Sequence, residues 1–224
     1  MRRFLNRLIA AVRPHPTIPA VPWRARSRWD LSIARVSILF FGLFIFGLGD
    51  SLLIVSHLGN APWTVLAQGI ASRLDLSVGT ATFLVSVLVL SLWIPLKERP
   101  GFGTVANIAI IAAAIDVGIS FFPQPSQFSF RLFYVLIGIA MVGIGSSLYI
   151  TCGLGPGPRD GLMTAIHHRT GIPVGWVRGL IEISVLILGW SLGGRLGLGT
   201  ALFALLIGYS VALSFGVVSR ITRR

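Results

Sequence analysis

Hydrophobic residues gather in six long stretches of the chain, separated by glycine, proline and polar residues. An apolar stretch of about 17 to 25 residues is long enough to cross the hydrocarbon core of a bilayer as an α-helix. The six predicted spans cover residues 36–56, 76–96, 103–123, 131–152, 174–192 and 198–219. The pattern therefore predicts an all-α protein, a polytopic membrane helix bundle with six transmembrane helices.

Two further segments look helical but are too short and too polar to span a membrane. They are residues 61–73 (APWTVLAQGIASR) and residues 157–169 (GPRDGLMTAIHHR). A helix satisfies its own backbone hydrogen bonds, so a short one can sit at the membrane surface or enter the bilayer in part. We expect both segments to be interfacial or re-entrant helices.

The order of small and polar residues repeats along the chain. A shift of 96 residues aligns residues 36–119 with residues 132–215 without a gap, and 24 of the 84 aligned positions are identical. The shift lays GLGDSLLIVSHLGNAPWTVLAQGI on GIGSSLYITCGLGPGPRDGLMTAI, and RPGFGT on RLGLGT. Apolar composition does not explain Gly, Pro, Arg and Thr matching at the same spacing. We interpret the chain as an internal duplication, with membrane repeat 1 at 31–125 and membrane repeat 2 at 126–219.

Each repeat holds three predicted spans. Because three is odd, the second repeat must enter the membrane from the opposite side, which makes the duplication an inverted repeat. Inverted repeats are typical of secondary transporters, where the binding site lies near the midplane between the halves. The alternative is that the duplication only built a stable bundle, since a fold does not by itself imply a function.

The composition agrees with a membrane protein and limits its partners. Hydrophobic residues make up 54% and charged residues 12% of the 224 positions, whereas about a quarter of the residues of soluble domains are charged. The net charge of +12 is unevenly placed, with eight of the nineteen basic residues in the first 35 positions. No aromatic and basic surface accompanies the charge, so we expect no nucleic-acid partner. The single cysteine, Cys152, excludes an intramolecular disulfide.

Basic residues outside the spans predict the orientation. Lys and Arg are enriched on the cytoplasmic side of membrane proteins. We expect residues 1–30 to form a cytoplasmic Arg- and Pro-rich extension, amphipathic, interfacial or disordered, and residues 220–224 to form a basic cytoplasmic tail. The loop at 97–101 then lies inside and the uncharged loop at 123–127 lies outside. The expected location is the inner cell membrane, with both termini cytoplasmic.

The paired motifs resemble a known family. LGNAPWTVLAQGI in the first half, GLGPGPRDGLM in the second, and the pair RPGFGT and RLGLGT are similar to the YczE family of bacterial integral membrane proteins, within the YczE/YyaS/YitT group. The likeness covers about residues 35–218. The family often has an acidic residue after the Pro-Trp of the first half, where this chain has Thr64. The resemblance implies a multi-pass plasma-membrane protein and supplies no established biochemical activity.

Four ionisable residues lie in the interior of predicted spans: Asp50, Asp116, Arg178 and Glu182. Such a group costs at least about 2.5 kcal/mol at the centre of a membrane helix, which makes each a candidate for a substrate or ion path. Their counterparts in the other repeat are all uncharged. Arg178 and Glu182 are four residues apart and can pair with each other. Either that structural pair or a role toward a substrate or coupling ion accounts for them.

Asp116 belongs to a stripe of small and polar residues. Ala109, Ala113, Asp116 and Ser120 recur at helical spacing and are expected to face the bundle interior. A protonatable Asp116 there could couple transport to protons, whereas the alternative is a carboxylate that caps a neighbouring helix or is held neutral by hydrogen bonds. The same two alternatives apply to Asp50.

The turn before each short segment supplies two more candidates, Asn60 and Arg159. Gly155 and Pro158 align with Gly59 and Pro62, which assigns these residues to a turn that ends a span and starts a short helix, with proline at the first helical position. Arg159 lies beside a helix N-terminus, and such an N-terminus attracts anions. A structural or positive-inside role is the other interpretation of Arg159.

Four glycines recur at a spacing of seven in the first span of each repeat. They are Gly42, Gly49, Gly138 and Gly145. Residues seven apart share a face of a helix, and small residues there allow two helices to approach closely. We expect these glycines to serve helix packing, with a permeation path as the alternative.

The leading hypothesis is a transporter or exporter of a small solute or ion. The alternative is a non-transporting membrane scaffold or regulatory protein, and the third is a membrane-embedded enzyme. No arrangement of a nucleophile with a base is visible, so we expect no enzyme activity and no catalytic residue. We also expect no cofactor and no metal site. The expected partners are the lipid bilayer and a small-molecule or ion substrate, and a homo-oligomer stays open.

Overall fold

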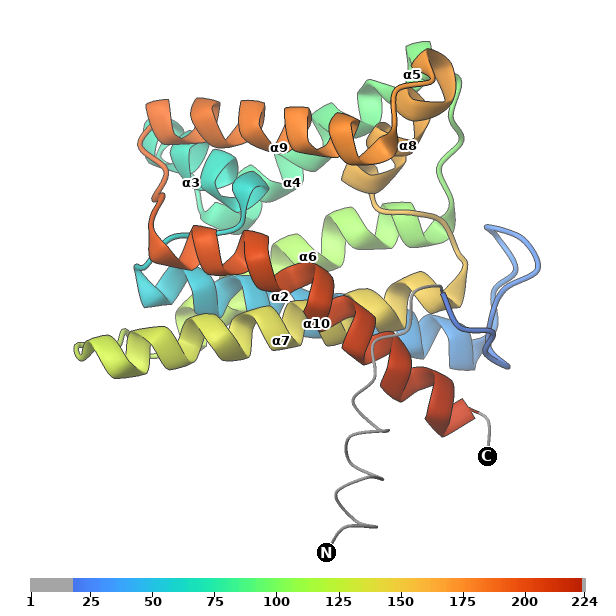
Figure 1. The fold of residues 1–224 in the computed structure, drawn as a ribbon, viewed down its shortest axis with the longest axis horizontal. Coiled ribbons are helices and arrows are strands. Elements are labelled where there is room, and N and C mark those ends of the chain that lie inside the picture. The colour runs from blue at the N-terminus through green and yellow to red at the C-terminus, as the bar shows by residue number, and fades with distance from the viewer. Residues whose placement is uncertain (1–17, 223–224) are drawn as a thin grey trace, which may run out of the picture.

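The computed structural model describes residues 18–222, which form a helical bundle without a strand (Figure 1). Six helical segments of this part are long and apolar enough to cross a membrane. They are α2 (Ile33–Ser56), α4 with α5 (Val78–Ser91 and Trp93–Leu96), α6 (Phe102–Phe121), α7 (Phe128–Cys152), α9 (Val174–Ser191) and α10 (Leu198–Thr222). The predicted all-α class and the six apolar spans are confirmed, with bounds that differ by a few residues.

The two short helices are also present, as α3 (Pro62–Leu74) and α8 (Pro158–Thr170). Each begins with proline at its first position, where the missing N–H has no intrahelical partner to lose. Each ends at a residue in the left-handed conformation, Asp75 after α3 and Gly171 after α8. In Figure 1, α3 lies toward one end of the bundle and α8 toward the other.

The helices pack in a regular order around a central pair. Helix α2 packs along α7, α2 also contacts α6, and α7 also contacts α10. Helix α3 packs on α9, and α8 packs on α4. Each short helix therefore packs against a long helix from the other half of the chain, which ties the two halves together.

Glycines allow the close approach of α2 and α7. A Cβ atom on Gly49 would lie 2.7 Å from the carbonyl oxygen of Gly138, and one on Gly145 would lie 2.5 Å from the carbonyl oxygen of Gly42. Close backbone contact through small residues is a main source of helix association in membranes. The four glycines that the sequence assigned to helix packing lie at this contact.

Alanine at Gly49 is expected to destabilise the protein by about 1 to 3 kcal/mol, because its methyl group would overpack against Gly138 and Val142. Gly179, in the middle of α9, is the matched control, since nothing lies within 4 Å of a Cβ there. Gly179→Ala should instead be neutral or stabilising by up to about 1 kcal/mol through helix propensity. Thermal unfolding of both variants in detergent measures the difference. Equal unfolding temperatures would contradict close packing at Gly49.

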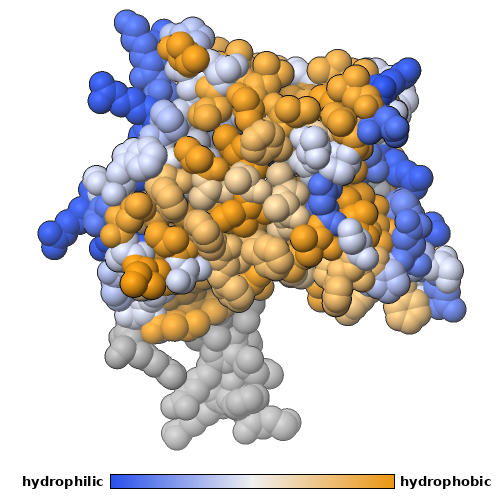
Figure 2. All heavy atoms as spheres, turned by 180° about the vertical axis from the view of Figure 1, so that it is seen from behind, coloured by the Kyte–Doolittle hydropathy of each residue, from blue (hydrophilic) through white to orange (hydrophobic). Residues whose placement is uncertain are grey.

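The surface agrees with a membrane environment. Figure 2 shows hydrophobic residues over the middle of the molecule and hydrophilic residues toward its two ends. Large apolar side chains such as Leu205, Phe121 and Ile187 are exposed. Soluble proteins rarely expose a large continuous apolar surface, whereas lipid tails cover one in a membrane.

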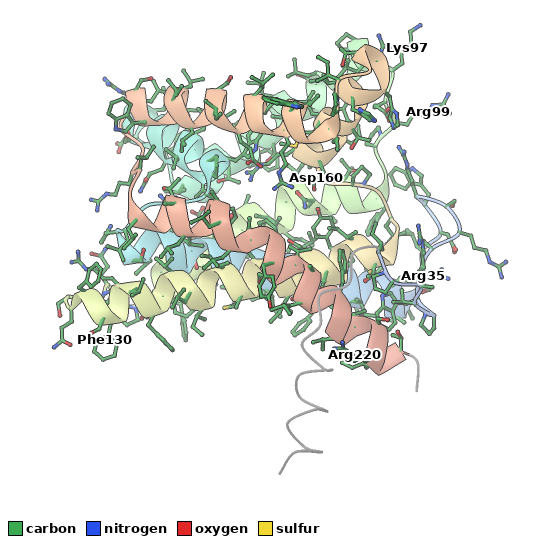
Figure 3. The ribbon with its side chains drawn as sticks, viewed as in Figure 1. Arg35, Lys97, Arg99, Phe130, Asp160 and Arg220 are labelled. Atoms are coloured by element: carbon green, nitrogen blue, oxygen red, sulfur yellow. The ribbon has the colours of Figure 1, made fainter. Side chains whose placement is uncertain are left out.

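Basic residues gather at one end of the bundle. Figure 3 shows Arg35, Lys97, Arg99 and Arg220 at this end, and Phe130 at the opposite end. The chain leaves α10 at the basic end, close to where it enters α2 (Figure 1).

Residues 18–30, part of the predicted extension, fold onto the basic end of the bundle. The Trp23 indole N–H donates to Thr151 Oγ1 at 3.3 Å, and the Ala25 amide donates to the Cys152 carbonyl at 2.9 Å. Asp30 pairs with Arg35 at 2.8 Å. A hydrogen bond from the Arg26 amide, with a further contribution from Arg35, holds the pKa of Asp30 below its ordinary value. The expectations for residues 1–17 and 223–224 lie outside the described residues.

Candidate functional site

The centre of the bundle holds a cavity of about 250 Å³. Every helix of the described chain except α5 contributes to its lining, and the first turns of both α3 and α8 do so. A cavity between helices, with a mostly apolar lining and a few polar groups, is a common place for a small-molecule site. The cavity is therefore the candidate site, and the two short helices are its most distinctive walls.

Each short helix starts inside the bundle and runs outward. Thr64, in the first turn of α3, hydrogen-bonds to Asp50, which precedes the end of α2 by more than one turn. Arg73, at the other end of α3, reaches the carbonyl of Leu192, just after α9. Asp160, in the first turn of α8, lies near the middle of the bundle in Figure 3. The two helix N-termini are thus directed at the cavity.

The first turns of α3 and α8 carry no side-chain cap. Their N-cap residues, Ala61 and Gly157, offer no side chain to accept hydrogen bonds from the free N–H groups. The macrodipole places about half a positive charge at each helix N-terminus. Two partly positive, uncapped helix ends therefore line one cavity.

The loops before the short helices are fixed by backbone contacts. Gly59 has a φ of 112° and Gly155 a φ of 117°, a region that favours glycine. The Gly199 amide donates to the Leu58 carbonyl at 2.7 Å, and the Gly103 amide donates to the Leu154 carbonyl at 2.8 Å. Both loops are thereby tied to the starts of α10 and α6, which sets where the short helices begin.

Arg159 is the unpaired cation of this cavity. Its guanidinium lies over the ring of Trp63, 5.2 Å from the ring centroid, in a cation–π contact. The charges of Asp50 and Asp160 act on it, but it makes no ion pair or hydrogen bond with any residue in the range 18–222. A guanidinium has five N–H donors, so Arg159 can still bind an anionic group.

Asp50 and Trp63 are buried polar groups that also line the cavity. Asp50 is 2% exposed, and its Oδ2 accepts a hydrogen bond from Thr64 Oγ1 at 3.4 Å. Its Oδ1 has no hydrogen-bond partner in the described part of the chain, and the same holds for the indole N–H of Trp63, which is 6% exposed. Buried polar groups are almost always hydrogen-bonded to protein or water, so this acceptor and this donor are available to a molecule that enters the cavity.

A second carboxylate lies opposite, on α8. The Tyr149 hydroxyl donates to Asp160 Oδ2 at 2.7 Å. Asp160 aligns with Thr64 under the 96-residue shift. In the first half the carboxylate is on the long helix and the hydroxyl on the short one, and in the second half these roles are reversed.

Arg178 and Glu182 line the cavity from α9 and pair with each other at 2.8 Å. The structural pair is therefore present. A role of either residue toward a substrate or coupling ion stays a prediction.

Asn60 and Asp116 are outside the cavity lining. Asn60 Nδ2 donates to Gln68 Oε1 at 2.9 Å. Asp116 accepts hydrogen bonds from the Ser77 hydroxyl at 2.6 Å and the Gly79 amide at 2.7 Å, at the start of α4. These contacts match the alternative in which Asp116 caps a neighbouring helix.

The predicted interior stripe on α6 is wrong. Ala109, Ala113 and Ser120 are exposed on the surface of the bundle, and Asp116 is only partly buried. The buried face of α6 combines Ile111 and Ile115 with small residues such as Ala112 and Ala114. The spacing correctly grouped the four residues, but it did not fix which way that face points.

Sequence reasoning did not select Trp63 and Tyr149 as site residues. Both are aromatic, and an aromatic residue in an apolar chain carries no signal of its own. The repeat alignment could have found Trp63, because it aligns with Arg159. Within residues 18–222, no group of three or more His, Cys, Asp or Glu side chains is placed to hold a metal ion.

Comparison with known proteins gives a family match and several relatives. The model described as "Family of unknown function (DUF6198)" matches residues 33–215. An "Uncharacterized protein" of Haemophilus influenzae is 44% identical over 204 residues, which cover 91% of this chain and 94% of the relative. The "Uncharacterized membrane protein YczE" of Bacillus subtilis is 32% identical over 184 residues, or 81% and 86% of the two chains. The Bacillus subtilis protein YyaS is 26% identical over 183 residues, or 80% and 91%. No solved structure matches the chain.

Proposed function

We propose a function from one premise: the chain belongs to the family described as "Family of unknown function (DUF6198)" and is a YczE-type membrane protein. The resemblance in the sequence is confirmed, and six apolar helices in residues 18–222 agree with a membrane location. The proposed function is transport of a small solute or ion, with the central cavity as its binding site. The observation that carries it is the meeting of two uncapped half-helix N-termini at one cavity that also holds charged side chains.

The lining of the cavity supports an inverted repeat. Nine lining positions of the first half each have their counterpart, 96 residues later, in the same lining. The pairs are Phe46 and Val142, Asp50 and Ser146, Ala61 and Gly157, Pro62 and Pro158, Trp63 and Arg159, Thr82 and Arg178, Ser86 and Glu182, Asn107 and Phe203, and Ile111 and Ile207. Such pairing is expected if a pseudo-twofold axis passes through the cavity.

The helix contacts support the same arrangement. The contact of α2 with α6 corresponds to that of α7 with α10, and the contact of α3 with α9 corresponds to that of α8 with α4. In our proposal α3 and α8 are re-entrant helices that enter from opposite sides. The basic end of the bundle is cytoplasmic, which puts both termini inside.

Transport accounts for the cavity better than a scaffold does. A bundle that serves only stability is expected to fill its centre with side chains at the density of an organic crystal. Here the centre contains an unpartnered carboxylate oxygen and an unpaired guanidinium among residues 18–222. The proposal includes no enzymatic step, since binding and release of the solute need only these fixed groups.

Thiol labelling tests access to the cavity. In a Cys152→Ser background, Ser146→Cys places a thiol in the cavity lining, and Ser147→Cys places one on the neighbouring buried position. A hydrophilic, membrane-impermeant maleimide is added to one side of the membrane at a time. It should label Ser146→Cys from each side, because alternating access exposes the site to both sides. Ser147→Cys should resist the reagent. A Ser146→Cys thiol that resists from both sides would indicate a closed centre and favour the scaffold.

Two exposed serines serve as markers of sidedness. Ser27 lies in the segment at the basic end, and Ser126 lies in the loop between α6 and α7. Ser27→Cys should react only from the cytoplasmic side and Ser126→Cys only from the outside. The reverse pattern would overturn the proposed orientation.

A further inference from the structure

The cavity contains both hydrogen-bond donors and an acceptor that have no hydrogen-bond partner in the described part of the chain. Arg159 and the Trp63 indole N–H are donors without a hydrogen-bonding partner in the described chain, and the uncapped N-termini of α3 and α8 lie beside them. All of these groups bind a negative charge favourably. Asp50 Oδ1 is a buried acceptor without a partner among residues 18–222 and needs a donor or a positive charge.

The groups that bind a negative charge and the group that needs a donor or a positive charge lie close together. Asp50 contacts Thr64, and Arg159 lies over Trp63, so the two charged groups touch neighbouring residues in the first turn of α3. The indole N–H of Trp63 belongs to the same turn. A ligand that meets both requirements must therefore carry its positive and negative groups only a short distance apart.

The charge balance argues against a ligand of one sign. Apart from the Arg178–Glu182 pair, the cavity has the carboxylates of Asp50 and Asp160 and the guanidinium of Arg159. The two helix N-termini add about half a positive charge each, which brings the sum near zero. A simple anion would leave Asp50 Oδ1 without a hydrogen-bond donor, and a simple cation would leave the N–H groups of Arg159 without an acceptor. A neutral ligand with separated charges satisfies both.

The size of the cavity favours a small ligand. Its volume is about 250 Å³. Pockets for drug-sized ligands start near about 300 Å³. The cavity therefore suits a small metabolite with few heavy atoms.

We propose that the cavity binds a small amino acid as a zwitterion. The carboxylate of the ligand is held by Arg159, the Trp63 N–H and the free N–H groups of the two helix ends, and its ammonium group is held by Asp50 Oδ1. The inference deepens the proposed function and rests on it for passage of the ligand across the membrane. Binding is testable separately from passage.

The test is ligand-dependent thermal stability of the full chain in lipid nanodiscs. The ligands are the twenty standard amino acids, each with its matched amine and carboxylic acid, such as L-alanine with ethylamine and propionate. At least one amino acid should raise the unfolding temperature, whereas its amine and its acid should not at equal concentration. Asp50→Asn and Arg159→Gln should each weaken that binding by at least about tenfold, since each removes a charge-assisted hydrogen bond. The exposed residues Asp75 and Arg169 provide matched controls, Asp75→Asn and Arg169→Gln, which should bind as the wild type does.

Other outcomes overturn the inference in distinct ways. Stabilisation by the acid alone, unchanged in Asp50→Asn, would make the cavity an anion site. Stabilisation by the amine alone, unchanged in Arg159→Gln, would make it a cation site. No response to any of the twenty amino acids would exclude this ligand class. If Ser146→Cys were still labelled from both sides, the proposal of transport would remain. An amino acid that binds but does not cross vesicle membranes would leave the inference standing and contradict transport.

Discussion

Replacement of Arg159 by glutamine should abolish the effect of this protein on the distribution of its solute across the cell membrane. Arg159 is the cation of the cavity that has no ion pair within residues 18–222, and it lies beside two uncapped helix N-termini. Loss of a charge-assisted hydrogen bond to a bound ligand costs about 1.5 to 3 kcal/mol, or about 10- to 150-fold in affinity. Glutamine keeps much of the length and polarity of the side chain and removes only the charge.

The measurement does not require the substrate to be known. Metabolites are profiled inside and outside cells that express the wild type, the Arg159→Gln variant or no protein. Expression of the wild type should change the ratio of the inside to the outside concentration of at least one solute. With Arg159→Gln, that ratio should be the same as in cells without the protein.

Arg169, in the last turn of α8, provides the matched control. Arg169→Gln removes the same charge from the same helix, but at its exposed end away from the cavity. It should preserve the wild-type profile. If both variants lose the effect equally, the charge of Arg159 acts through the orientation of the protein in the membrane and not through the binding site. That result would support the positive-inside role, which is the other interpretation of Arg159 from the sequence.

The helices were predictable because membrane spans obey a length rule. A run of apolar residues as long as the bilayer is thick seldom occurs outside a transmembrane helix, and each predicted span overlaps a helix. The start of each short helix was also marked, by Pro62 and Pro158 at the first helical position. The ends of the spans were harder to place, because a helix continues beyond the run of apolar residues that marks it. Helices α2 and α7 begin at Ile33 and Phe128, three residues before the predicted positions 36 and 131.

The candidate site was only partly predictable. Asp50 stood out because a charge inside an apolar span is costly, and Arg159 stood out because it lies beside the expected N-terminus of a short helix. Trp63 and Tyr149 did not, since their side chains matter only once the fold brings the Trp63 ring to Arg159 and the Tyr149 hydroxyl to Asp160. Spacing along a chain says which residues share a helix face. It does not say which neighbour that face meets.

Asp116 illustrates that limit. Its stripe on α6 was expected to face the interior, but small residues are equally compatible with the surface of a membrane bundle. Another face of the helix, which carries Ile111 and Ile115 together with small residues such as Ala114, takes the interior instead. Asp116 is drawn to the start of α4 because free N–H groups there need an acceptor, and Gly79 supplies one of them.

The two halves share a scaffold and differ in charge. The turns at Gly59 and Gly155, the prolines that follow and the backbone hydrogen bonds to α10 and α6 are the same in both halves. The charged and aromatic residues on that scaffold are not the same, since Trp63 aligns with Arg159. An asymmetric ligand such as a zwitterion fits a symmetric frame whose two halves carry different polar and charged groups.

Alanine at either Gly59 or Gly155 should destabilise the protein by about 2 to 6 kcal/mol. Part of the loss, about 1 to 3 kcal/mol, is backbone strain, because φ values of 112° and 117° are rarely adopted by residues with a side chain. A further 1 to 3 kcal/mol, roughly, comes from overpacking. A Cβ on Gly59 would lie 2.6 Å from the Gly197 amide nitrogen, and one on Gly155 would lie 2.9 Å from Thr104 Oγ1.

Gly171, after α8, separates the two contributions. It has a φ of 71°, within the left-handed region, and nothing lies within 4 Å of a Cβ at this position. Gly171→Ala should therefore lose only about 1 to 2 kcal/mol, from the conformation alone. Unfolding of the three variants in detergent, followed by circular dichroism, gives the comparison. If Gly59→Ala and Gly155→Ala were both as mild as Gly171→Ala, the loops would not be held against α10 and α6. If only one were mild, the two turns would not be equivalent, and the pseudo-twofold relation between the repeats would fail at the point where the half-helices begin.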